Sequence, residues 1–120
     1  MVTNEEIVKA CMSTLQDARK ERITVFLNAY QIWGVLNEKN SPICEQLRES
    51  YGKDVGEGAG ERFTPVVRIS QALSRSKKIE HRYMDGRLTK FRIGNKDIEP
   101  AYIYDIFRLR ENDKVVLCRS

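Results

Sequence analysis

The chain has 120 residues, a net charge of +4, 41% hydrophobic residues and 32% charged residues. This length suits one folded domain that buries a hydrophobic core and needs no metal ion or disulfide bond for stability. Its apolar runs are far shorter than the roughly 20 residues that cross a bilayer, and its N-terminus has no signal-peptide pattern. We therefore expect a cytoplasmic protein with no membrane contact.

The cysteines and the single histidine give no sign of a metal or of catalysis. Cys11, Cys44 and Cys118 are too widely spaced for a metal knuckle and odd in number, so they predict small buried side chains in a reducing compartment. His81 has no second histidine with which to bind a metal. Nucleophile motifs and paired catalytic carboxylates are not recognisable either. We predict no metal, no cofactor and no enzymatic activity.

Helix-start patterns mark the N-terminal half. Thr3 precedes Glu6 by three residues and Asn28 precedes Gln31 in the same way, which is the spacing of a capping box. Apolar residues at helical spacing follow each pattern, and Trp33 lies on the second apolar stripe as an expected core residue. The predicted elements are a helix over about 4–20, a short strand over 23–26 and a helix over about 29–38.

Two further helices begin with a hydroxyl residue and a proline. Ser41-Pro42 and Thr64-Pro65 each place a capping oxygen before a proline that suits the first helical position. They predict helices over about 42–51 and 65–75. The segment Gly56-Glu57-Gly58-Ala59-Gly60 between them predicts a flexible loop, because its GxGxG spacing and acidic residues do not match a nucleotide-phosphate loop.

The fourth predicted helix has two different faces. At about 100° per residue, its apolar and polar residues fall on opposite sides. The expected core face consists of Val66, Ile69 and Leu73, and the opposite face consists of Arg68, Gln71 and Arg75.

Residues 79–93 alternate around Asp85-Gly86 in the pattern of a β-hairpin. A two-residue loop leaves neither face of this hairpin apolar. A three-residue loop, Met84-Asp85-Gly86, gathers one face from Ile79, His81, Tyr83, Thr89, Phe91 and Ile93. We therefore favour the three-residue loop, with His81 packed and hydrogen-bonded on the inner face.

The C-terminal extension, residues 101–120, is rich in strand formers. Residues 102–109 predict a strand, and a turn before residues 115–117 predicts a second hairpin. A short helix over 101–109 is the competing interpretation, because the apolar residues there also fit a helical stripe.

Positive charge is concentrated between Thr64 and Lys96. This stretch has nine Lys or Arg residues and two acids, a charge of +7, whereas the rest of the chain has twelve basic and fifteen acidic residues, a charge of −3. Such an asymmetry on a helix followed by a hairpin favours binding of an anionic polymer, with duplex DNA as the leading candidate.

The order of these elements and the placement of charge resemble the winged helix-turn-helix superfamily over residues 4–93. The resemblance implies an α+β fold with a helical N-terminal half, followed here by a β-hairpin wing and a C-terminal hairpin. It also implies that the helix over 65–75 enters the major groove while the wing over 79–93 flanks it. The extra helix and glycine loop at 41–63 depart from the short turn that is usual in this superfamily.

The residue types on this unit suit DNA. Arg and Gln make bidentate contacts to guanine and adenine, so Arg68, Gln71 and Arg75 are the candidate base readers. Arg87, beside the hairpin tip, is a candidate for the minor groove. The candidate phosphate contacts are Lys77, Lys78, Arg82, Lys90 and Arg92. A small DNA-binding protein, such as a transcriptional regulator, is the predicted function.

The second hypothesis is a protein-interaction module that uses the same scaffold without nucleic acid. Its candidate contacts are the clustered aromatic residues Tyr102, Tyr104 and Phe107. DNA-binding proteins of the helix-turn-helix type often bind two half-sites as dimers, so the sequence is also compatible with a homodimer.

Overall fold

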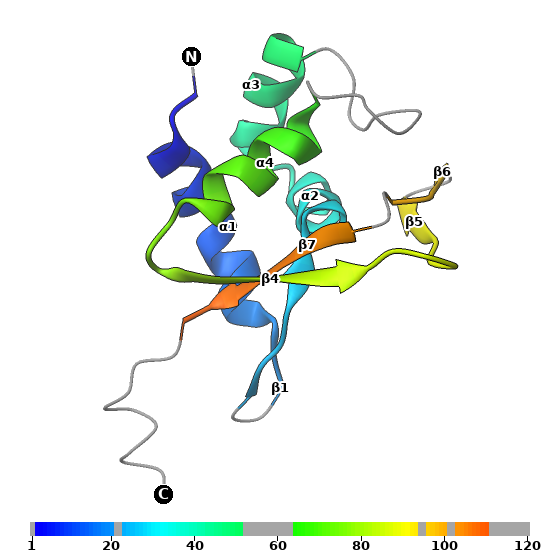
Figure 1. Cartoon of the computed structure of the whole chain (residues 1–120). Coiled ribbons are helices and arrows are strands. Elements are labelled where there is room, and N and C mark those ends of the chain that lie inside the picture. The colour runs from blue at the N-terminus through cyan, green and yellow to red at the C-terminus, as the bar shows by residue number, and fades with distance from the viewer. Residues whose placement is uncertain (1, 21–22, 52–63, 94–95, 101–102, 111–120) are drawn as a thin grey trace, which may run out of the picture.

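The computed structural model describes residues 2–20, 23–51, 64–93, 96–100 and 103–110. These residues form an α+β structure with four helices and small antiparallel sheets, which confirms the α+β part of the predicted fold class (Figure 1). The helices are α1 (Asn4–Asp17), α2 (Ala29–Glu38), α3 (Pro42–Tyr51) and α4 (Pro65–Ser74). The strands are β1 (Arg19–Lys20), β2 (Ile23–Thr24), β3 (Leu27–Asn28), β4 (Ile79–Asp85), β5 (Phe91–Ile93), β6 (Lys96–Ile98) and β7 (Ile103–Leu109).

The predicted caps begin three of the helices. The side chains of Thr3 and Thr64 accept hydrogen bonds from backbone N–H groups of α1 and α4, and Asn28 and Gln31 form a complete capping box on α2. The predicted bounds of α2 and α3 are confirmed. Helix α1 ends at Asp17, three residues earlier than predicted, because the chain turns there into β1, which pairs with β2.

One core holds the helices against the sheet. Trp33 is only 1% exposed, so its predicted core position is confirmed. Cys11 and Cys44 are buried in the core, as predicted, and Cys118 lies outside the described residues. The largest fully buried side chains come from all four helices and both long strands, and include Ile7, Leu15, Ile32, Leu36, Leu47, Ile69, Leu73, Ile79 and Phe107.

The main sheet corrects the predicted hairpin over residues 79–93. Strand β4 pairs antiparallel with β7 over its whole length, from Ile79 opposite Leu109 to Asp85 opposite Ile103, and β5 pairs with β6 instead. Strand β7 offers seven paired positions and a fully buried Phe107, whereas the sequence between β4 and β5 offers a local turn only. The seven paired positions and the burial of Phe107 therefore favour β7 as the partner of β4.

The strand interpretation is confirmed for residues 103–109, and the competing helix is wrong for these residues. Strand β7 lies in the middle of a three-stranded sheet, between β3 and β4. Its partners are therefore strands that are distant in the sequence. Residues 115–117, which were the predicted hairpin partner, lie outside the described residues. The glycine loop over 52–60 lies outside them too.

A polar network joins the sheet to α4. His81 on β4 places Nε2 2.5 Å from Oδ1 of Asp105 on β7, and its ring stacks on Phe107. The second carboxylate oxygen of Asp105 accepts a hydrogen bond of 3.1 Å from Ser70 Oγ on α4. The predicted packed, hydrogen-bonded histidine is confirmed.

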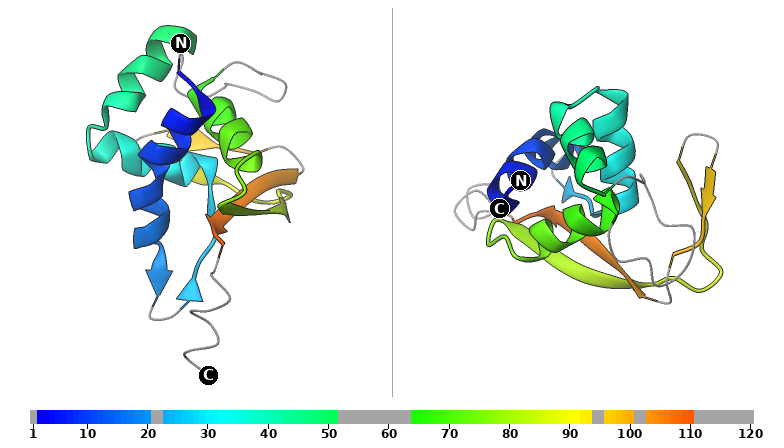
Figure 2. Two further views of the ribbon diagram at one scale, coloured as in Figure 1. Left: turned by 90° about the vertical axis from the view of Figure 1, so that its left-hand side faces the viewer. Right: turned by 90° about the horizontal axis from the view of Figure 1, so that it is seen from above.

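Helix α1 and the small β5–β6 hairpin occupy different ends of the molecule. Figure 2 shows α1 at one end and β5–β6 at the other, with β4 running between them along an outer edge. Within the described part of the chain, no helix is long and apolar enough to span a membrane.

Candidate nucleic-acid interface

Helix α4 has the predicted core face and part of the predicted polar face. Val66, Ile69 and Leu73 are 4% exposed or less, whereas Gln71 and Arg75 are exposed. Packing of the apolar face on α1 and α2 leaves the polar face toward solvent.

Arg68 does not belong to this exposed face. Its guanidinium is half-buried and donates hydrogen bonds to Asn4 Oδ1 and to the Val2 carbonyl, so it ties α4 to the start of α1. A group engaged in this way is not free for base contacts. The base-reading candidates therefore reduce to Gln71 and Arg75.

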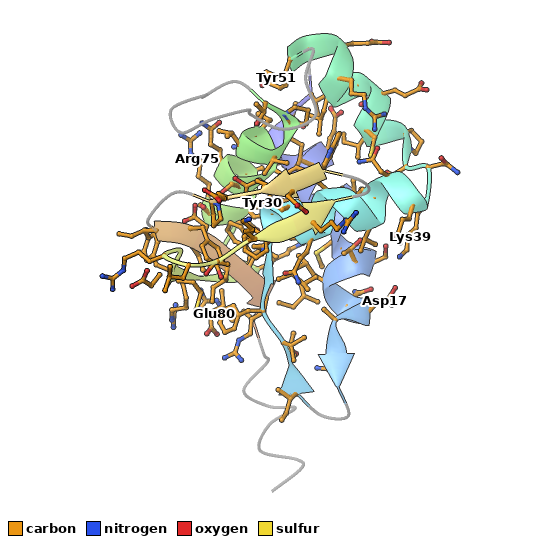
Figure 3. All side chains as sticks on the ribbon, turned by 90° about the vertical axis from the view of Figure 1, so that its right-hand side faces the viewer. Asp17, Tyr30, Lys39, Tyr51, Arg75 and Glu80 are labelled. Carbon is orange, nitrogen blue, oxygen red and sulfur yellow. The ribbon has the colours of Figure 1, made fainter. Side chains whose placement is uncertain are left out.

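Three cations come together where α4 leads into β4. Arg75, Lys77 and Lys78 are exposed, and none of their side chains has a hydrogen bond or ion pair with another described residue. The backbone beneath them is held, because Arg110 donates to the carbonyls of Lys77 and Lys78. We call this group of three residues the junction patch. Figure 3 labels one of them, Arg75.

Two of the predicted phosphate and groove contacts are already paired with acids. Arg82 forms an ion pair of 3.5 Å with Glu80, which also binds Arg108 at 3.0 Å. Arg87 makes a bidentate contact with Asp85, in which Nη2 donates to Oδ2 at 2.6 Å and Nε donates to Oδ1 at 3.1 Å. This contact lowers the pKa of the Asp85 carboxyl and raises the pKa of the Arg87 guanidinium.

A second cationic group lies at the far end of β4. Lys90 and Arg92 are exposed around β5 and have no side-chain partner among the described residues. The β5–β6 hairpin is fixed to the body by Phe91, whose ring stacks on Tyr30 of α2 at 5.6 Å. The +7 stretch therefore presents two patches at opposite ends of β4, and we call Lys90 and Arg92 the hairpin patch (Figure 1).

The predicted protein-contact residues have different surroundings. Phe107 is 0% exposed and belongs to the core, so it is not a surface contact. Tyr104 is half-buried with its ring edge against Phe91, and Tyr102 lies outside the described residues.

An exposed apolar group that the sequence analysis missed lies near them. Tyr83, Met84 and Ile103 are 67%, 45% and 66% exposed, and they line an open depression at the end of the β4–β7 pair. The unpredicted pairing of β4 with β7 is what brings Ile103 beside the other two. The sequence signal was the adjacent pair Tyr83-Met84 just before the turn-like Asp85-Gly86 pattern.

In the described part of the chain, no group of three or more His, Cys, Asp or Glu side chains is placed to hold a metal ion. Comparisons with protein-family models, curated proteins and solved structures found no match.

Proposed function

We propose that this protein binds duplex DNA through a winged-helix-like arrangement of α4 and the β4–β7 pair. The order of elements supports this assignment, because β3 lies between α1 and α2, and α4 is followed by β4 and then by β7 in the middle of the sheet. In this arrangement the wing is formed by β4 and β7, with β5–β6 inserted at its tip.

The observation that carries the proposal is the difference between paired and unpaired cations. The two acids of the basic stretch, Glu80 and Asp85, already bind arginines. The charge that faces solvent is therefore the junction patch and the hairpin patch, whose side chains form no ion pair with another described residue; Asp97 lies opposite Arg92 in the β5–β6 pair. Unpaired surface cations attract phosphates and release counterions when they bind.

The two patches suit one stretch of duplex. The seven residues of β4 between them span roughly 24 Å at about 3.4 Å per residue, which is the length of roughly seven base pairs. Lys77, Lys78, Lys90 and Arg92 would contact phosphates and set affinity. Gln71 and Arg75 have the donor and acceptor groups that read adenine and guanine edges.

Fluorescence anisotropy with a random duplex tests this proposal. The variant Lys77→Ala/Lys78→Ala loses two phosphate contacts, so the slope of log K against log salt should fall in magnitude by roughly 1.8. Lys39→Ala is the matched control, because Lys39 is an exposed lysine that pairs with Asp17 on another side of the molecule. Equal slopes for wild type and the double variant would rule out contacts by the junction patch.

A second candidate function is protein binding through Tyr83, Met84 and Ile103. Exposed apolar groups of this kind often mark interaction sites. A partner recovered after nuclease treatment should be lost with Tyr83→Ser/Ile103→Ser and kept with Ile23→Ser, which changes an equally exposed isoleucine on β2. If nuclease alone removes the partner, the contact is through nucleic acid and this candidate fails.

A further inference from the structure

A groove runs between α1 and the C-terminal end of α4. Its volume is about 590 Å³, and its floor is apolar, formed by Val8, Met12 and Ala72. Val8 and Met12 lie one turn apart on the same face of α1, and Ala72 leaves room because its side chain is small. Ala72 is 1% exposed, so the partly exposed Val8 and Met12 provide most of the apolar surface of the floor.

The rim of this groove is cationic. Lys9, Arg75 and Lys78 line it from α1, from the end of α4 and from the start of β4, and their side chains have no partner among the described residues. Glu5 is the one carboxylate among the residues that line the groove. The rim therefore carries a surplus of two positive charges beside an apolar floor.

We propose that this groove binds a small anionic amphiphile, whose carboxylate or phosphate head lies at the cationic rim and whose alkyl chain lies on the apolar floor. The volume lies in the range of small-molecule sites, about 300 to 1,000 Å³. From Asn4 to Met12 the groove follows α1 for only about 12 Å, at roughly 1.5 Å per residue, which suits a medium-length chain better than a partner helix. Met12 adapts its shape to such a chain readily.

The site also links the ligand to the junction patch. Arg75 and Lys78 line the groove and belong to the patch, so a bound anionic head neutralises charge that would otherwise attract phosphates. A bound amphiphile should therefore weaken DNA binding. This consequence rests on the proposed function, whereas the groove as a ligand site does not.

Methyl NMR of methionine-labelled protein tests the site directly. Decanoate, added below its aggregation concentration, should shift the methyl resonance of Met12 in a saturable way and leave that of Met84, on β4, unchanged. Decyl phosphate is the second ligand, and the one of the two that binds more tightly identifies the preferred head group. Acetate, which lacks the chain, and decanol, which lacks the charge, should each bind at least tenfold more weakly.

Variants then distinguish binding in the groove from non-specific binding of the amphiphile to the protein surface. Arg75→Ala/Lys78→Ala should weaken decanoate binding at least tenfold, and Lys39→Ala should leave it unchanged. Figure 3 shows that Lys39 and Arg75 lie on opposite sides of the molecule. Equal affinity for decanol and decanoate, full affinity in the double variant, or equal shifts of Met12 and Met84 would overturn the proposal. Saturable binding in a protein that never binds duplex would contradict the DNA function alone.

Discussion

Cys11 lies on the buried face of α1. Its side chain is 0% exposed, and burial, with a smaller contribution from Cys44, raises the pKa of the thiol from 9.0 to about 12. The folded state therefore holds this proton more tightly than the unfolded state does. The stabilisation is fully present below pH 9.0 and is lost as the pH rises toward about 12.

We predict that the free energy of unfolding falls by about 1.4 kcal/mol per pH unit across that window through Cys11 alone. Urea unfolding of wild type and Cys11→Ala, measured just below pH 9.0 and well above it, isolates this contribution as the difference between the two proteins. The same pH dependence in both proteins would mean that the thiol is solvated.

Single residues of α4 also show which features the sequence predicts and which it does not. The helical angles of α4 assign Val66, Ile69 and Leu73 to the core, and all three are buried. The same angles place Arg68 with Gln71 and Arg75, yet Arg68 binds Asn4 and Val2. Periodicity within one helix carries no information about which distant segment packs beside it, so the partners of Arg68 could not be predicted.

At the scale of elements, local signals predict helices well and strand pairing poorly. The caps at Asn28 and Thr64 involve residues three positions apart, so α2 and α4 begin where the sequence predicts. The pairing of β4 with β7 joins residues far apart in the chain, and a turn-like Asp85-Gly86 pattern directed the prediction to the wrong partner. The junction and hairpin patches consequently lie farther apart than a simple hairpin implies.

The network of Asp105, His81 and Ser70 holds these distant elements together. Asp105→Ala leaves both partners without their acceptor, so we expect a loss of about 1 to 2 kcal/mol in the free energy of unfolding. Asp97→Ala, which removes an exposed carboxylate on β6, is the matched control and should change stability little. Chemical denaturation measures both, and equal stability of the two variants would contradict the structural role of the network.

At the scale of the whole molecule, pairing of charges matters more than their number. The stretch from Thr64 to Lys96 carries +7, but Arg68, Arg82 and Arg87 are engaged within the protein. Five of its cations, Arg75, Lys77, Lys78, Lys90 and Arg92, have no partner among the described residues. The sequence therefore predicts the presence of a basic surface, and the tertiary structure decides which of its residues are available.

We propose that both patches contact one duplex at the same time. The most direct measurement is the salt dependence of duplex binding for wild type, Lys77→Ala/Lys78→Ala and Lys90→Ala/Arg92→Ala. Four phosphate contacts predict a slope of log K against log salt of about −3.6, and each double variant should retain roughly half of it. No duplex binding at low salt, or a slope that neither double variant changes, would rule out binding of one duplex by the two patches.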